Sequence, residues 1–287
     1  VNITRIRPLN ETELLVATEG MGVYKLDMNK CILERYISAN YQSYNEMNGD
    51  NINDVFVDES KRIWLANYPT GITVIDYRYE NYHWMKHSMG NKQSIVNDQV
   101  HAVIEDSDGD LWFGTSNGIS LYNSGTGEWH SFLSSFNHQL KDKNHIFITL
   151  CEVSPGIIWA GGYTSGIYKI NKADLSVEYF SPYLLSHINM RPDKYIRDMI
   201  KDSKGHIWSG GYYNLKCFDL ATNSVRLYPG VSSITAIAEK DSHNMWIGTA
   251  MGLYLLNRDS GKYEYIKLEA GSTYINTLYQ ADNGLLY

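Results

Sequence analysis

The feature of this sequence that most constrains its fold is an internal repeat anchored on tryptophan. Five copies read IWLANYPTG, LWFGTSNG, IWAGGYTSG, IWSGGYYN and MWIGTAMG. An earlier copy has Leu in the tryptophan position, and a last, incomplete copy has Tyr there. The anchors are spaced by 49, 48, 47, 49, 38 and 41 residues, at Leu15, Trp64, Trp112, Trp159, Trp208, Trp246 and Tyr287. Periods of this length indicate a repeat architecture, because a functional site is normally single.

Each copy contains four short runs of β-branched and aromatic residues, separated by turn residues. An apolar run precedes the tryptophan, as in INDVFV at Ile52 and VHAVIE at Val100. The tryptophan run, a third run such as ITVIDY, and an aromatic fourth run such as KYEYIKL follow it. Runs of this kind bounded by Asp, Asn, Ser and Gly are typical of strands joined as hairpins. No segment has a sustained apolar stripe at helical spacing.

Four strands in a repeat of roughly 40 to 50 residues predict an all-β fold, a β-propeller of four-stranded blades. We expect one propeller domain over residues 1–287, with six full repeats, a partial seventh and seven-bladed geometry. The expected blades are 3–51, 52–99, 100–146, 147–195, 196–233 and 234–274. The partial unit predicts either a gapped ring or a blade completed by sequence outside this chain, which looks like a piece of a longer protein. The shorter spacing of 38 residues also allows a junction between two propellers.

Small residues follow the anchors at one equivalent position: Ala17, Ala66, Gly114, Gly161, Gly210 and Gly248. They predict a close approach of neighbouring sheets near the axis. The tryptophans then fill the widening gap between blades, and burying each contributes roughly 2–3 kcal/mol.

The run DSDGD, Asp106 to Asp110, has the acidic density of a metal loop. A calcium loop needs a bidentate carboxylate near its twelfth position, which here is Asn117. The corresponding turns of other repeats lack matching acidic sets. The run is therefore predicted to be a turn whose side chains bond backbone amides, with Gly109 in a left-handed conformation. His138 and His145 lie seven residues apart in a polar loop, which favours a solvated loop over a zinc pair. We expect no metal and no cofactor.

Composition limits the classes of partner. The formal net charge of −7 argues against nonspecific binding to nucleic acid or membranes. No apolar run reaches 18 residues, so a membrane helix is expected only outside this chain. Cys151 and Cys217 replace apolar strand residues, while Cys31 lies far from both in sequence. Buried free thiols are therefore expected at Cys151 and Cys217 rather than a disulfide.

The segment VHAVIEDSDGDLWFGTSNGISLYN, Val100 to Asn123, resembles the two-component regulator propeller repeat. The shared pattern is D-x-x-G-x-L/I-W-x-G-T followed by G-L/I, and it recurs along essentially the whole chain. Two copies depart from it: the first lacks the tryptophan, and the fifth has Asn214 in place of the second glycine. The resemblance implies the periplasmic sensor region of a hybrid two-component system of Bacteroidetes type. It also implies an oligosaccharide ligand, a homodimeric full-length receptor and a histidine kinase outside this chain.

Two other functional classes remain open, because propellers host both. One is a carbohydrate-active lyase or glycosidase, and the other is a structural or protein-interaction propeller. A glycosidase needs two juxtaposed carboxylates, whereas Asp54, Asp98 and Asp198 are scattered singly among the repeats. We expect no enzymatic activity and no catalytic residue in this chain.

The expected ligand site lies on the face that carries the turns between second and third strands. Four residues after the anchor, that turn holds a tyrosine in three repeats, and the second residue of the innermost strand is polar in four. The candidate ligand-binding residues are Tyr68, Tyr163, Tyr212, the adjacent Tyr213, Asn53, His101, Arg197 and Asn276. Tyrosines offer stacking surfaces for sugar rings, and Arg197 favours a carboxylate or sulfate. In the alternative interpretation, the tyrosines cap blade edges and the polar residues bind channel water.

Overall fold

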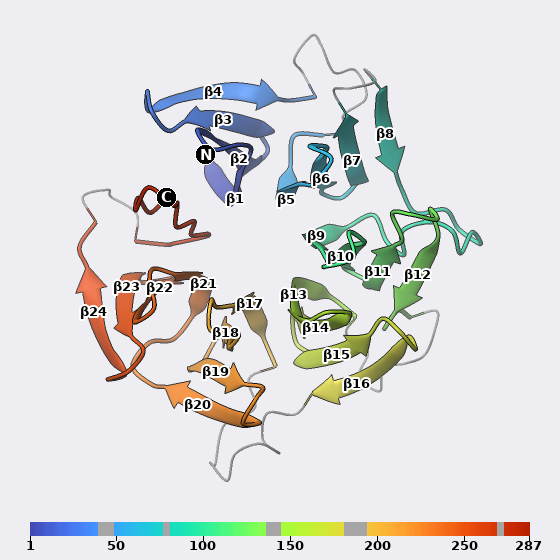
Figure 1. Cartoon of the computed structure of the whole chain (residues 1–287). Helices are drawn as coiled ribbons and strands as arrows, with labels where there is room; N and C mark the ends of the chain where they lie inside the picture. Colours follow the sequence, from blue (N-terminus) through green and yellow to red (C-terminus); the bar gives the residue numbers. More distant parts are fainter. Residues whose placement is uncertain (40–48, 77–80, 136–144, 181–193, 269–272) are drawn as a thin grey trace. The chain divides into compact units, whose positions relative to one another are not determined.

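The computed structural model describes residues 1–39, 49–76, 81–135, 145–180, 194–268 and 273–287. They form two compact units, Val1–Phe147 and Ile148–Tyr287, each built from three four-stranded antiparallel sheets (Figure 1). No helix occurs among the described residues, as the repeat pattern predicts. In the same residues there is accordingly no helix of the length and apolarity needed to cross a membrane.

The first unit contains blades 1 to 3. Blade 1 consists of β1 (Asn2–Pro8), β2 (Glu13–Glu19), β3 (Val23–Asp27) and β4 (Ile32–Ile37). Blade 2 consists of β5 (Ile52–Val57), β6 (Ile63–Asn67), β7 (Gly71–Asp76) and β8 (Asn81–Met85). Blade 3 consists of β9 (Val100–Glu105), β10 (Leu111–Thr115), β11 (Gly118–Tyr122) and β12 (Trp129–Phe132).

The second unit contains blades 4 to 6. Blade 4 consists of β13 (Phe147–Ser154), β14 (Ile157–Gly162), β15 (Ile167–Asn171) and β16 (Ser176–Phe180). Blade 5 consists of β17 (Ile196–Lys201), β18 (Ile207–Gly211), β19 (Leu215–Asp219) and β20 (Ser224–Tyr228). Blade 6 consists of β21 (Ile234–Glu239), β22 (Asn244–Thr249), β23 (Gly252–Asn257) and β24 (Lys262–Ile266).

Strands are paired in sequence order within each sheet, so every blade is a meander of hairpins. Six complete blades therefore confirm the six full repeats. Among the described residues, a seventh blade is represented only by residues 273–287, where Ile275 donates to the Thr249 carbonyl and Gln280 bridges Leu286. The seven-bladed geometry is thus not confirmed.

The small residue after the tryptophan permits the close packing that the sequence predicts. A Cβ built on Gly210 would lie 2.4 Å from Cγ2 of Ile234, the first residue of the next blade. Gly161 faces Ile196 at 2.6 Å, and Gly248 faces Ile275 at 2.5 Å. Because even a methyl group would overlap the next innermost strand, glycine sets the distance between these sheets.

Tryptophans fill the space between successive blades, as expected. Trp64 packs in one cluster with Val100, Val103 and Phe113 of blade 3, and Trp208 packs with Ile234 and other residues of blade 6. Both are almost fully buried. Trp246 is an exception, because it is only half-buried.

The DSDGD run is a turn, as predicted, and Asp106 organises it. Its Oδ1 accepts hydrogen bonds from the amides of Asp108 and Asp110, each 3.0 Å long, and Gly109 has φ +82°. Its Oδ2 accepts a 2.9 Å bond from the indole Nε1 of Trp112. The structure thus reveals an aspartate, six residues before the tryptophan, that holds both the turn and the indole.

The same aspartate–indole bond recurs in blades 2 and 5. Trp64 Nε1 donates to Asp58 Oδ2 at 2.9 Å, and Trp208 Nε1 donates to Asp202 Oδ2 at 2.7 Å. In blade 6 the residue six positions before the tryptophan is Lys240 rather than aspartate, and Trp246 Nε1 instead donates to Gln280 Oε1 at 2.7 Å. A buried indole N–H needs an acceptor, and the repeat supplies one in each of these blades.

Candidate ligand-binding site

Two predicted tyrosines lie exposed on neighbouring turns of the second unit. Tyr163 lies in the turn between β14 and β15, and Tyr212 in the turn between β18 and β19. Their exposed fractions are 43% and 53%, high for residues of this size. The first turn is closed by a 2.8 Å bond from the Gly162 amide to the Gly166 carbonyl, with φ +81° at Gly166. Because the turn backbone is fixed, the ring is held at the rim of blade 4.

Tyr195 joins these two tyrosines into one aromatic cluster. Its ring is stacked on Tyr212, with centroids 4.3 Å apart and an interplanar angle of 25°. It meets Tyr163 edge-on, with centroids 5.3 Å apart. Tyr195 immediately precedes the innermost strand β17 and is half-buried, so it is the inner member of the cluster. We call Tyr163, Tyr195 and Tyr212 the tyrosine cluster.

Sequence reasoning missed Tyr195, although a signal for it exists. The residue before the innermost strand is Tyr195 in blade 5, and Tyr274 stands in the same place before Ile275. Tyr274 is exposed and lies in the segment that packs on blade 6. Aligning the repeats one position further upstream would have identified both tyrosines.

The tyrosine cluster has a distinct electrostatic setting. Burial raises the pKa of Tyr195, the positive charge of Arg197 opposes this shift, and the neighbouring hydroxyls of Tyr212, Tyr274 and Tyr163 add to it. The Tyr195 hydroxyl is therefore protonated at neutral pH and retains a hydrogen to donate. Arg197 is half-buried and lies two residues further along, on β17. Aromatic faces, a hydroxyl donor and a guanidinium are thus combined in one region.

The two remaining candidates of the second unit lie at the margin of this region. Tyr213 follows Tyr212 in the same turn and is 41% exposed. Asn276 is half-buried in the segment that follows blade 6, directly after Ile275. Of the predicted residues in this unit, Tyr163 and Tyr212 share ring contacts with Tyr195, and Arg197 acts on its electrostatics.

In the first unit, the structure brings Tyr68, His101 and Asn53 together. The Tyr68 ring lies 6.3 Å from the His101 imidazole, centroid to centroid. Nδ1 of His101 is 3.5 Å from Nδ2 of Asn53, and its Nε2 is 2.7 Å from the Ser116 hydroxyl. Tyr68 is 37% exposed, whereas Asn53 and His101 are half-buried.

Asn53 also has a structural role that its position alone did not reveal. Its Nδ2 donates a 2.9 Å hydrogen bond to the carbonyl of Val100, the first residue of the next blade. Thr4 and Thr235 occupy the same strand position and donate to Ile52 and Ile275 in the same way. The second residue of the innermost strand therefore links neighbouring blades in these repeats.

The three aspartates considered as possible catalytic carboxylates each bond to structural partners. Asp54 is 1% exposed and accepts bonds from the amides of Val55 and Val103 and from Nε of Arg5. Asp198 accepts from the amides of Met199 and Ile237 in the equivalent arrangement. Asp98 accepts from the His87 amide. Each carboxylate thus satisfies backbone donors.

Within the described residues, no group of three or more His, Cys, Asp or Glu side chains is arranged to hold a metal ion. His145 bonds the Leu133 carbonyl at 2.8 Å, while His138 lies outside the described residues. Cys151 and Cys217 are buried free thiols, as predicted, and Cys31 is exposed.

Comparison with known proteins defines the repeat. Residues 94–117 match the family described as two component regulator propeller. The match is confined to this one segment of the chain. The match covers β9, β10 and the DSDGD turn between them, which are the residues that carry the resemblance in the sequence. No curated protein matches the chain.

Solved structures agree on the fold. The chain is similar to the extracellular domain of the putative hybrid two component system BT3049 from B. thetaiotaomicron, with 20% identity over 99% of this chain and a TM-score of 0.79. It is also similar to PorZ, an essential surface component of the type-IX secretion system of Porphyromonas gingivalis, with 19% identity over 100% of this chain and a TM-score of 0.74. The chain spans 38% and 45% of these two proteins, respectively. The likenesses establish a β-propeller of four-stranded blades.

Proposed function

We propose that this chain is the extracytoplasmic ligand-sensing propeller of a hybrid two-component receptor and that it recognises an oligosaccharide without turning it over. The tyrosine cluster beside Arg197 is the observation that carries the ligand assignment. The regulator propeller repeat at residues 94–117 supports the receptor class.

Carbohydrate is the ligand class that suits this chemistry. The apolar faces of sugar rings stack on exposed tyrosines, and sugar hydroxyls pair with phenol and guanidinium donors. Arg197 favours a sugar that carries a carboxylate or sulfate, because the guanidinium fork binds such groups through two parallel hydrogen bonds. Tyr213, Asn276, Tyr68, His101 and Asn53 remain candidates for further contacts.

The receptor assignment implies partners outside this chain. The propeller would transmit its signal through a membrane helix to a histidine kinase, in a periplasmic arrangement. The full-length receptor would be a homodimer whose sensor regions rearrange on binding. Such a rearrangement needs only a few kcal/mol of differential ligand affinity between two states.

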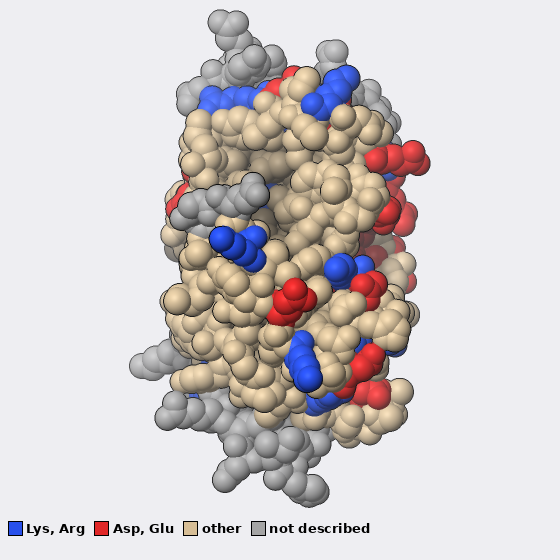
Figure 2. All heavy atoms as spheres, turned by 90° about the vertical axis from the view of Figure 1, so that its left-hand side faces the viewer, with Lys and Arg blue, Asp and Glu red and all other residues tan. Residues whose placement is uncertain are grey.

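Charge distribution agrees with a polar, uncharged or weakly acidic ligand rather than nucleic acid. In the face drawn in Figure 2, basic and acidic side chains are scattered among uncharged residues, and the described residues there form no continuous basic patch. The net charge of −7 adds a long-range repulsion toward polyanions.

The test is calorimetric titration of an oligosaccharide panel into the wild-type protein and into Tyr163→Ala, Tyr212→Ala and Arg197→Ala. Each substitution is expected to weaken binding by about tenfold, because loss of one stacking or charged contact removes roughly 1–2 kcal/mol. Tyr265→Ala is the matched control, since Tyr265 is 50% exposed but lies on the outermost strand β24. Unchanged affinity in all three variants would place the ligand elsewhere.

The same panel separates the rival classes. A glycan that shifts the thermal unfolding midpoint without release of products supports a sensor, whereas measurable turnover supports a carbohydrate-active enzyme. A propeller that binds no glycan and captures a protein partner would instead be an interaction module. The similarity to a surface component of a secretion system is the observation that favours an interaction module as the second candidate.

A further inference from the structure

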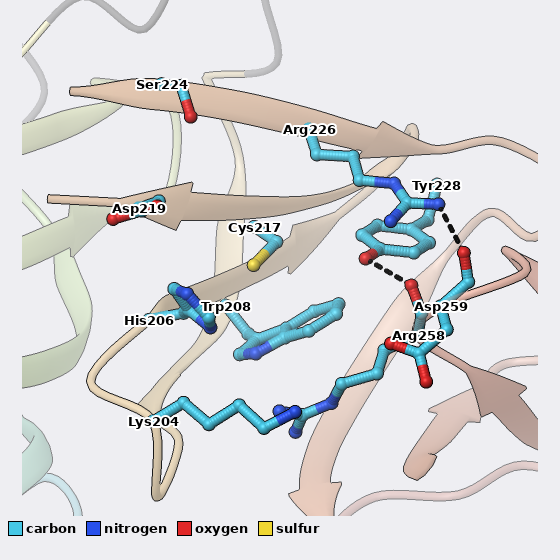
Figure 3. A pocket seen from close by; sticks show the side chains of 10 residues that line it. All are labelled: Lys204, His206, Trp208, Cys217, Asp219, Ser224, Arg226, Tyr228, Arg258 and Asp259. Atoms are coloured by element: carbon cyan, nitrogen blue, oxygen red, sulfur yellow. Dashed lines mark hydrogen bonds between the residues drawn. The ribbon is translucent and has the colours of Figure 1, made fainter. Parts of the chain in front are cut away.

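A pocket separate from the tyrosine cluster lies in the second unit, on the face of blade 5 that adjoins blade 6 (Figure 3). Trp208, Cys217 and Arg226 are paired across β18, β19 and β20, so their side chains form one row on this face. Tyr228 extends the row at the end of β20, and Arg258 and Asp259 approach from blade 6. The cavity measures about 250 Å³, enough for a ligand group the size of a monosaccharide.

Arg258 is a buried cation with an unused donor. Its side chain is 5% exposed, and its Nη atoms lie 3.1 Å from Asp202 and 3.0 Å from Glu239. Its guanidinium lies 5.5 Å from the centre of the Trp208 ring. The Nε atom is buried and has no hydrogen-bond partner among the described residues. Since buried donors are normally paired, this unpaired N–H in the wall of the pocket points to an acceptor from a ligand.

Two more cations border the pocket without ion-pair partners among the described residues. Arg226 lies over the Tyr228 ring at 4.7 Å and donates from Nη2 to the Asp259 backbone carbonyl at 3.0 Å. These contacts hold the guanidinium in place without an ion pair among the described residues. Lys204 extends along Trp208 toward Arg258 in Figure 3, and it is exposed.

The two acidic side chains that line the pocket are already engaged. Asp219 accepts bonds from the amides of Ala221 and Thr222, and hydrogen bonds from Thr222 lower its pKa. Asp259 lies 2.7 Å from Nδ1 of His243, which lowers the pKa of Asp259. Both carboxylates keep their negative charge but already accept hydrogen bonds from neighbouring groups, whereas Arg226 and Lys204 have no ion-pair partner among the described residues.

We propose that this pocket binds an oxyanion, a carboxylate or sulfate group, between Arg226, Lys204 and Nε of Arg258. Arg226 would contribute the guanidinium fork, which matches the geometry of two oxyanion oxygens. Lys204 would contribute an adaptable point charge, and the N–H at Nε of Arg258 would donate its unused hydrogen bond to an oxyanion oxygen. The proposal concerns different residues from the tyrosine cluster and does not rest on the proposed function.

The test is calorimetric titration with sodium sulfate, sodium glucuronate and glucose, at constant ionic strength in a chloride buffer. Saturable binding of sulfate or glucuronate, with none of glucose, is expected. Arg226→Gln and Lys204→Gln should each weaken binding by about tenfold, because each removes a charge-assisted contact. Lys92→Gln is the control of equal charge change, since Lys92 is exposed in the first unit.

The arms of the experiment distinguish the source of the oxyanion. Equal binding of sulfate and glucuronate would indicate a site for a free anion, and binding of glucuronate alone a site for an acidic sugar. Absence of binding by both, or equal weakening by Lys92→Gln and Arg226→Gln, would overturn the proposal. The double variant Tyr163→Ala and Tyr212→Ala should retain this binding, so failure of the tyrosine cluster as a glycan site would be seen separately.

Discussion

Replacing Gly210 by alanine should test the close packing of neighbouring blades more directly than any other single change. Gly210 lies in β18 without a positive φ, so alanine can adopt its backbone conformation. The added Cβ would lie 2.4 Å from Cγ2 and 2.9 Å from Cβ of Ile234, and 3.3 Å from Cδ1 of Ile237. Real Cβ contacts are longer than 3.0 Å, so the neighbouring strand must move.

The size of the destabilisation depends on how far the residues around the new methyl group can move. Ile234 is completely buried, and its Cβ is fixed to the backbone of the innermost strand β21. Overpacking of this kind costs about 1–3 kcal/mol, whereas alanine recovers only about 0.5–1 kcal/mol of strand preference over glycine. The strain therefore wins. At the centres of these ranges the net cost is about 1 kcal/mol, so the thermal midpoint should fall by about 2–5 °C, given roughly 2–4 °C per kcal/mol for a domain of this size.

Thermal and urea unfolding of the wild type, Gly210→Ala and a control variant would measure this loss of stability. Gly125→Ala is the matched control, because its nearest neighbour is Asn123 Oδ1 at 3.5 Å and its φ is not positive. It should change the midpoint little. In a double-mutant cycle, Ile234→Ala removes the Cγ2 that the new methyl group meets, so Gly210→Ala should cost less in that background. Strictly additive effects, or an unchanged midpoint for Gly210→Ala alone, would refute the packing argument.

Two further properties can be checked in the same protein. Burial raises the pKa of Asp202, but hydrogen bonds from Trp208 Nε1 and the His206 amide and the charge of Arg258 outweigh it, so the pKa lies below its usual value. Because the folded-state pKa is depressed, this carboxylate stabilises the fold above the unfolded-state pKa and the contribution is lost as pH falls through the folded-state pKa. The urea-derived free energy of unfolding of Asp202→Asn should thus be lower than wild type at pH 7 and fall less steeply below pH about 4; parallel pH curves would contradict the assignment. Burial also raises the pKa of Cys151 and of Cys217 to about 12, so a thiol reagent at pH 8 should label only the exposed Cys31 in the folded protein and all three cysteines in denaturant. Rapid labelling of all three without denaturant would show that the two buried positions are open.

The strands and their grouping into blades follow from local sequence patterns. The innermost strands of blades 2, 3, 5 and 6 begin where the apolar runs begin, at Ile52, Val100, Ile196 and Ile234. Strands can be predicted because the alternation of apolar and polar residues and the turn residues that bound them lie within a few positions of one another in the sequence. The small residue two positions after the anchor likewise predicted close packing, since every blade has alanine or glycine there.

Contacts between side chains of different blades could not be predicted in this way. Tyr195 joins Tyr163 and Tyr212, although about 50 residues separate the two turns. Arg258 of blade 6 contacts Asp202 and Trp208 of blade 5. It therefore lines a pocket formed mainly by residues of the neighbouring blade. No local pattern encodes these contacts. They depend on the distance and angle between adjacent sheets, which are set by the packing of buried residues on both of them.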